Sequence, residues 1–381
     1  MVTPPGESNP QGELRLTPQE AEEIKEKSRW LRRVANPFVD FYVIISIGAA
    51  GASETAGVAQ QHENRQMRDH AKDLTPIQRK IYAEDFAVIV GHLPFLKNRL
   101  ESNDPSRFIQ KILHQVQSAA SRARQSDTKT IKVSIVKLIP QEYLPLDANG
   151  NQEVNAYQDL KVKNPDSSKS WRGWEHPITA RLLCPADHLA EFKADPKSAR
   201  AKLRDGKLSL LDSKGDPKFP AFLYNEDIMD GSLAQGLFRG PLLLAVYIHI
   251  FFSPSGATGA KASLKRGNAK IHGMEKVVPS TICYAAIQAY VALCCAAEWK
   301  EEWKGIKFPR LYILLREQFA YPDDPWHADT LRWWNDKVYG TPRGANEDVP
   351  EIAQETEGPS TRERSECERQ QRIQAAAAQN T

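Results

Sequence analysis

The sequence is poor in cysteine and has little net charge. Its five cysteines are odd in number, follow no regular spacing and form no Cys-x-x-Cys pair, which excludes a zinc ribbon and a thioredoxin-type site. We interpret them as free thiols in a reducing compartment. With 51 Lys and Arg against 48 Asp and Glu, the charge of the whole chain does not favour a polyanion partner, so any such surface must be local. The polar N-terminus lacks the basic and apolar regions of a signal peptide, and we expect an intracellular protein of the cytoplasm or nucleus.

Signatures of catalysis and of cofactor binding are also missing. Neither Gly-x-x-x-x-Gly-Lys-Ser/Thr nor Gly-x-Gly-x-x-Gly occurs, and no paired carboxylates or Ser-His-Asp set can be assigned from spacing. The one metal-type spacing joins His176, Cys184 and His188, but Pro185 follows the cysteine directly and no fourth donor is indicated. Packing and capping explain these side chains better. We therefore predict no catalytic set, no metal site and no cofactor.

Two long apolar runs stand out, at residues 240–252 and 277–297. The second run contains no charged residue and is long enough to cross a bilayer. It also carries Tyr284, Gln288 and Tyr290, and much of the remainder is Ala and Cys, which insert weakly. We therefore expect no membrane span but two helices buried nearly all round in a core.

The pattern elsewhere predicts a mainly α-helical chain. Thr17-Pro18, Thr75-Pro76 and Asp104-Pro105 each combine an N-cap residue with proline in the first turn. Residues 128–139 alternate like a strand but also fit helical spacing, and we favour the helix. We expect a single helical domain at 17–340 around the two buried apolar helices, with a long loop or insertion at 140–170. The N-terminus (1–16) and the polar tail (341–381) are predicted to be disordered, with a transient helix around the alanine run at 375–378 as the alternative for the tail.

The loop between the apolar runs, residues 253–276, is the best candidate binding surface. It sets several cations against the single acid Glu275, and its glycines allow the backbone to approach a ligand closely. Cations together with exposed amides suit phosphate groups. The alternative is a loop that is simply basic and solvated. The predicted polyanion-binding residues are Lys261, Lys265, Arg266, Lys270 and His272.

Three functions stay open at this point. The leading one is a non-enzymatic binding or scaffold protein whose basic loop contacts nucleic acid or an acidic protein. The second is an enzyme with a pocket near His249 and His272, with Cys184 as a further candidate, although His249 fits a core histidine better. The third is a structural protein that oligomerises through apolar or tryptophan-bearing surfaces, such as Trp299 and Trp303 on one helix face.

Several motifs in a fixed order resemble a known family. They are WRGWEH at 171–176, RLLCP at 181–185, FPAFLY at 219–224, GLFRGPLLL at 236–244, HIFFSPSG at 249–256, GNAKIHGM at 267–274, YAAIQA at 284–289 and LRWWN at 331–335. Over roughly residues 36–339 the chain is similar to a large uncharacterised family of basidiomycete fungi, known only as a domain of unknown function. The resemblance implies one folded, mainly helical domain and carries no activity or catalytic residues.

Overall fold

The computed structural model describes residues 15–51, 71–102, 104, 106–144, 160, 169–252, 267–296, 302–340 and 360–379. Over these residues the chain is mainly helical, which confirms the predicted fold class. The described part contains one sheet, a hairpin of the antiparallel strands β1 (Glu302–Trp303) and β2 (Ile306–Lys307). The predicted N-terminal segment at 1–16 and the predicted insertion at 140–170 lie largely outside the described residues.

The first helices begin where the Thr-Pro pairs predict. Helix α1 (Pro18–Val34) starts with a capping box, in which Thr17 Oγ1 accepts from the Glu20 amide at 3.2 Å and the Glu20 carboxylate accepts from the Thr17 amide at 2.7 Å. Helix α5 (Pro76–His92) repeats this box with Thr75 and Gln78. The other N-terminal helices are α2 (Phe41–Gly51) and α6 (Pro94–Glu101).

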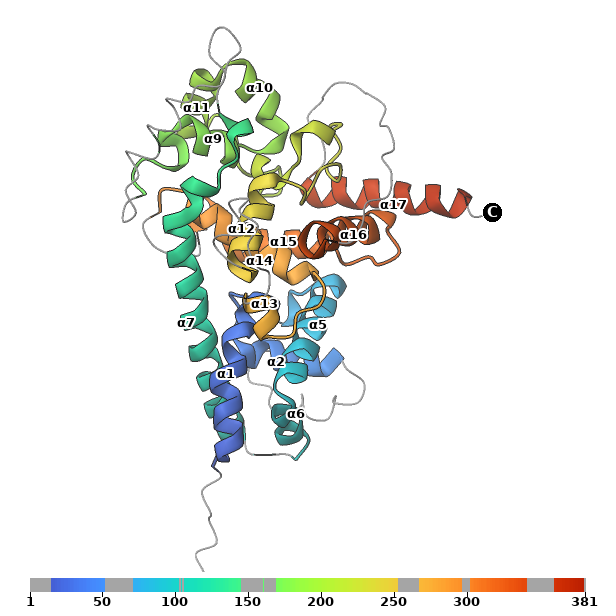
Figure 1. The fold of residues 1–381 in the computed structure, drawn as a ribbon. Helices are drawn as coiled ribbons and strands as arrows, with labels where there is room; N and C mark the ends of the chain where they lie inside the picture. Colours follow the sequence, from blue (N-terminus) through green and yellow to red (C-terminus); the bar gives the residue numbers. More distant parts are fainter. Residues whose placement is uncertain are drawn as a thin grey trace, which may run out of the picture.

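Helix α7 (Ser106–Leu138) is a single helix of 33 residues. It confirms the helical interpretation of residues 128–139 and joins that segment to the helix predicted after Asp104. Its apolar face is buried and includes Ile109, Ile112 and Val116. Helix α1 packs along α7, and α2 packs on α5 (Figure 1).

The two apolar runs form α12 (Pro241–Phe251) and α14 (Pro279–Leu293), which pack on each other and on α7. Every residue of α14 after its first proline is buried. One buried polar pair joins the two helices, since the Tyr247 hydroxyl of α12 lies 3.2 Å from Thr281 Oγ1 of α14. In the part of the chain that the structure describes, no helix is long and apolar enough to span a bilayer.

Two buried cations cap the C-terminus of α14. Lys169 Nζ donates to the Val291 carbonyl at 2.6 Å, and Arg172 Nη1 donates to the Ala292 carbonyl at 2.8 Å. These bonds satisfy carbonyls that a helix leaves unpaired at its C-terminus. The prediction that Trp299 and Trp303 share a helix face is wrong, because α14 has ended before them and Trp303 lies in β1; residue 299 lies outside the described residues.

Short helices connect these long elements. They are η1 (Gln141–Tyr143), η2 (Gly173–Glu175), α9 (Pro177–Leu183), η3 (Ala186–His188), α10 (Leu189–Ala194), α11 (Pro196–Arg204), η4 (Ala221–Leu223) and η5 (Glu226–Ile228). After the hairpin come α15 (Phe308–Glu317) and α16 (Pro325–Tyr339).

The C-terminal part differs from the predicted disordered tail, because residues 361–379 form helix α17 (Thr361–Gln379), which lies beside α16 (Figure 1). Arginines hold α17 to buried acids. Arg362 binds Glu317, and Arg372 donates to both carboxylate oxygens of the fully buried Asp324, at 3.0 and 2.7 Å. The polar composition that indicated disorder instead supplies ion pairs to partners that are distant in sequence.

Candidate functional site

The described part of the predicted basic loop is the short helix α13 (Asn268–Ile271) and the turn after it. Lys261, Lys265 and Arg266 lie outside the described residues. Lys270 is exposed on α13, and His272 is the C-cap residue of this helix. The structure therefore describes two of the five predicted residues, Lys270 on α13 and His272 at its end.

Close contacts with α12 anchor α13. Asn268 Nδ2 donates to the Ile250 carbonyl at 2.8 Å. Gly267 packs so closely on the backbone of Phe252 that a Cβ there would overlap the Phe252 carbonyl oxygen. The end of the basic loop is thus fixed to the core.

His272 stacks on Trp30 of α1. The ring centroids are 4.7 Å apart and the interplanar angle is 20°. Burial is the largest cause that lowers the pKa of His272 from 6.5 to about 4, and the nearby cations Arg33, His92 and Arg29 lower it further. The imidazole is therefore neutral at pH 7, and it lies where α13 meets the cationic side of α1.

His249 belongs to the core, as expected from its apolar surroundings in the sequence. It is buried on α12, and burial lowers its pKa, so it is also neutral at pH 7. Its Nδ1 meets no hydrogen-bond partner among the described residues. The neighbouring Phe251 packs edge-to-face on Trp30, with ring centroids 5.6 Å apart.

A buried polar network joins α1, α7 and α14. Arg33 donates from Nε and Nη2 to the two carboxylate oxygens of Asp127, each at 2.8 Å, and the Tyr284 hydroxyl donates to Asp127 Oδ2 at 2.7 Å. Gln288 Nε2 donates to that hydroxyl at 2.9 Å, while Gln288 Oε1 accepts from Thr128 at 3.0 Å. Because its polar groups are mutually satisfied, we interpret the network as structural.

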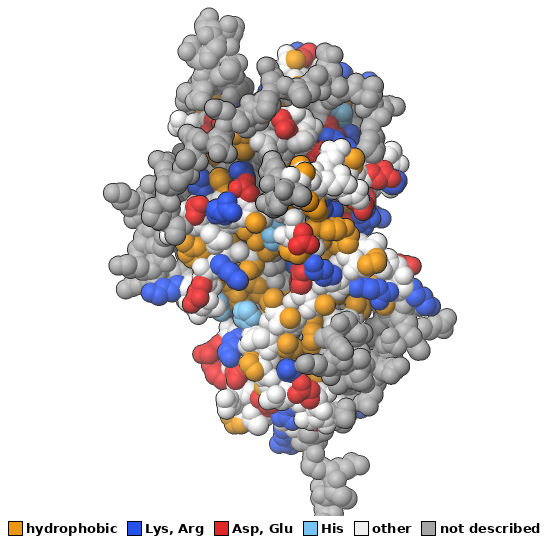
Figure 2. Space-filling view, turned by 90° about the vertical axis from the view of Figure 1, so that its right-hand side faces the viewer, with side chains coloured by type: hydrophobic (Ala, Val, Ile, Leu, Met, Phe, Trp, Pro, Cys, Tyr) orange, Lys and Arg blue, Asp and Glu red, His pale blue; other side chains and the backbone are white. Residues whose placement is uncertain are grey.

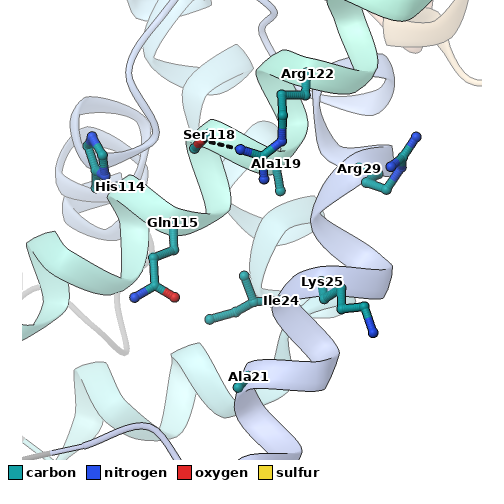
Figure 3. Close-up of a pocket in the computed structure, with 9 residues that line it drawn as sticks. All are labelled: Ala21, Ile24, Lys25, Arg29, His114, Gln115, Ser118, Ala119 and Arg122. Carbon is teal, nitrogen blue, oxygen red and sulfur yellow. Dashed lines mark hydrogen bonds between the residues drawn. The ribbon is translucent and has the colours of Figure 1, made fainter.

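A groove of about 400 Å³ lies between α1 and α7. Ile24 and Gln115 point into the space between the helices, whereas Lys25 and Arg29 extend outward from α1 (Figure 3). Arg122 on α7 donates to Ser118 Oγ at 2.9 Å. The groove is lined by Ala21, Ile24, Lys25, Arg29, His114, Gln115, Ser118, Ala119 and Arg122.

The groove is cationic, and its charges are only partly neutralised. None of its lining residues is acidic, and the imidazole of His114 is the one aromatic ring among them. Lys25 pairs with Glu22 at 2.9 Å on the exposed surface of α1. Arg29 and Arg122 make no ion pair with any residue that the structure describes. Arg29 also lies close enough to His272 to lower its pKa, so this arginine is common to the groove and to the end of the basic loop.

Sequence reasoning missed the groove. Lys25 lies four residues before Arg29 on α1, about one helical turn, and Ser118 lies four residues before Arg122 on α7. This spacing could have placed each pair on one helix face. It could not show that the two faces meet.

On a different face of the molecule, the described side chains form no patch of one charge (Figure 2). Figure 2 shows hydrophobic side chains across the middle of that face, with Lys and Arg interspersed with Asp and Glu among the coloured side chains. Such mixing gives no field of one sign. The unpaired cations of the α1–α7 groove therefore differ from this surface.

The thiol and the two histidines of the metal-type spacing lie in separate surroundings, and the buried His176 accepts from the Ile178 amide through Nδ1 at 3.3 Å. Cys184 is buried, and burial raises the pKa of its thiol to about 12. His188 has its Nε2 3.4 Å from Lys218 Nζ. Within the described ranges, no group of three or more His, Cys, Asp or Glu side chains could hold a metal ion.

Comparison with known proteins gives a family and no activity. A family model described as "Family of unknown function (DUF6698)" matches residues 118–339. No curated protein and no solved structure matches the chain.

Proposed function

The chain belongs to this family of unknown function, and we propose that it is a non-enzymatic binding or scaffold protein that contacts an anionic partner, nucleic acid or an acidic protein. The proposal includes the basic loop at 253–276 and the cations beside it. An intracellular location, in the cytoplasm or nucleus, and an origin in a basidiomycete fungus stay predictions from the sequence.

The observation that carries the proposal is a set of cations without acidic partners. Arg29, Arg122 and Lys270 come from α1, α7 and α13, and none of them pairs with an acid in the described part of the chain. The stack of Trp30 on His272 fixes α13 against α1. Cations that the fold leaves unneutralised, on elements held in a fixed relation, support binding of an anion from outside.

The enzyme alternative has less support. It needs titratable groups that converge in an accessible pocket. His249 is buried in the core, His272 stacks on a tryptophan, and the thiol of Cys184 has a raised pKa. The groove that we describe includes none of these three side chains.

The oligomer alternative also has less support. Trp334 is fully buried and Trp333 is partly buried, packing edge-on against its neighbour with ring centroids 5.6 Å apart. Among the described residues, the large hydrophobic side chains that are well exposed are Trp171 and Ile271, and the other hydrophobic side chains on the face in Figure 2 are at most partly exposed or small. Light scattering of the purified protein over a range of concentrations tests this alternative, and a monomer throughout contradicts it.

The test of the proposed function is anion binding as a function of salt. We expect labelled duplex DNA, poly-glutamate or both to bind the full chain, with an affinity that falls steeply as salt rises. Replacing Lys261, Lys265, Arg266 and Lys270 together with Ala is expected to weaken this binding. The proposal is wrong if neither probe binds at low salt, and its loop component is wrong if wild type and variant bind equally.

A further inference from the structure

Helix α17 packs on the rest of the chain with a polar face. Four of its side chains recur at i, i+3, i+7 and i+10, the spacing of one helix face, and they are Arg362, Ser365, Arg369 and Arg372. A helix that packs on a core usually carries apolar side chains at such positions. None of the described residues of α17 belongs to the hydrophobic core. Charge and hydrogen bonds therefore hold this helix in place.

The arginines of this helix face bind two acids and one aromatic ring. Arg362 Nη2 donates to both carboxylate oxygens of Glu317 at 2.7 Å. Arg369 Cζ lies 3.7 Å from the centroid of the Tyr321 ring, a cation–π distance, and its Nε is 4.0 Å from Asp324 Oδ2. The same Asp324 accepts the two hydrogen bonds from α17 described above. Each arginine of the face thus has a partner that recognises a guanidinium group.

The surface beneath α17 is acidic and comes from separate segments of the chain. Glu317 ends α15, and Asp324 lies before α16, where its Oδ1 also accepts from the Trp326 amide at 3.0 Å. Beside the arginines of the helix face, Arg364 donates to Asp187 of η3 at 3.0 Å. We call this surface the acidic face, and it comprises Asp187, Glu317, Tyr321 and Asp324. Carboxylates and an aromatic ring at these places suit any helix that repeats arginine at the same spacing.

The contacts of α17 with the acidic face can be exchanged for others. The side chains of Arg362 and Arg372 stay 34% and 29% exposed, so water and salt reach their ion pairs. When α17 leaves, the charges that it uncovers are solvated by water, and the hydrophobic core stays closed. A helix of 19 residues is only marginally stable by itself, so its position depends on these contacts. We therefore expect α17 to open locally before the core does.

The acidic face lies within residues 118–339, the segment that matches the family model, whereas the helix that covers it lies beyond this segment. We infer that the acidic face is an interaction surface for an arginine-bearing helix of a partner protein, and that α17 is its intramolecular occupant. The partner helix repeats arginine at i, i+7 and i+10, as α17 does, and displaces α17 when it binds. This inference goes beyond the proposed function, because it concerns a cationic partner and a surface separate from the basic loop.

The test uses the full chain and a labelled peptide with the sequence of residues 360–379. The double variant R362E/R372E reverses two arginines of α17 and leaves the acidic face unchanged. A tethered helix competes at an effective concentration of about 1 mM, so we expect the peptide to bind R362E/R372E about tenfold more tightly than the wild type, or better. The matched control is Q370E/Q374E, which adds acids at exposed positions of the same helix and is expected to bind the peptide as the wild type does. A peptide that itself carries R362E/R372E is expected to bind neither chain.

Hydrogen–deuterium exchange measures the release of α17 directly. We expect its amides to exchange faster in R362E/R372E, and faster in the wild type as salt rises, while the amides of α14 keep their protection. Unchanged exchange of α17 in the variant overturns the inference, because the arginines then do not hold the helix. Equal binding of the peptide by wild type and variant, or binding by neither, also overturns it. If α14 loses protection in R362E/R372E, the neutral variant R362Q/R372Q takes its place with the same expected and opposing results.

Discussion

Asp127 holds three helices together, and replacing it tests how much the buried network contributes to stability. Its carboxylate accepts two hydrogen bonds from Arg33 and one from Tyr284, and the side chains of the Arg33–Asp127 pair are only 8% and 9% exposed. In D127N the amide keeps the size of the carboxylate but not its charge. The guanidinium of Arg33 is then buried without a counter-ion.

Removing one partner of a buried ion pair costs about 3–5 kcal/mol, chiefly because the remaining charge stays desolvated. Whole domains are stable by only about 5–15 kcal/mol, so we expect D127N to lose about a fifth or more of the free energy of unfolding. Urea unfolding followed by circular dichroism measures this loss. The midpoint is expected to fall while the slope stays unchanged, since the fold itself is kept.

The double variant R33M/D127L is the control, because it removes both charges and fills the space with apolar groups. Such replacements are often close to neutral, apart from about 1 kcal/mol for the Tyr284 hydroxyl left without its acceptor. The double variant is therefore expected to be more stable than D127N. The reasoning fails if D127N loses less than about 1 kcal/mol of the free energy of unfolding. It also fails if the effects of the single substitutions R33M and D127L on this free energy add up to the effect of the double variant.

Three further predictions concern other parts of the fold. Folding lowers the pKa of His272 from 6.5 to about 4, so between these pH values the unfolded chain binds more protons and the free energy of unfolding decreases as the pH falls. H272Q is expected to reduce this pH dependence, measured by urea unfolding. An unchanged pH dependence contradicts the assignment to His272. G267A places a methyl group on the carbonyl oxygen of Phe252 and is expected to lower the free energy of unfolding by more than about 2 kcal/mol. G273A, at φ +65° with open space around it, is expected to lower it by about 1 kcal/mol. Equal thermal midpoints of the two variants would show that the packing of Gly267 on Phe252 is unimportant. R372A removes both hydrogen bonds from Arg372 to Asp324, so the amides of α17 are expected to exchange with deuterium about tenfold faster or more while those of α14 do not change; a uniform increase in exchange is the opposing result.

The sequence predicts local features of this fold well. The helix starts at Thr17 and Thr75 depend on side chains within one turn, and α12 and α14 are visible as apolar runs. The ends of elements are harder to predict, because α14 stops where Lys169 and Arg172 reach its carbonyls from more than a hundred residues away in the sequence.

The candidate site could not be predicted for the same reason. The pattern of each helix places Arg29 and Arg122 on its polar surface, but only the packing of α1 on α7 makes them two sides of one groove. Similarly, the polar composition of residues 361–379 resembles that of a disordered tail, and the acids that hold α17, Glu317 and Asp324, lie in other parts of the chain.

The continuity of α7 has a consequence for dividing the protein into fragments. The segment that matches the family model begins at residue 118, inside this helix, and not at a loop. A fragment cut there would lose the first turns of α7 together with α1, and would expose the apolar face of α7 on which α1 packs. We therefore expect a fragment of residues 118–339 to aggregate, and the smallest soluble fragment to begin before Thr17. We expect the autonomous folding unit to be larger than the segment that matches the family model.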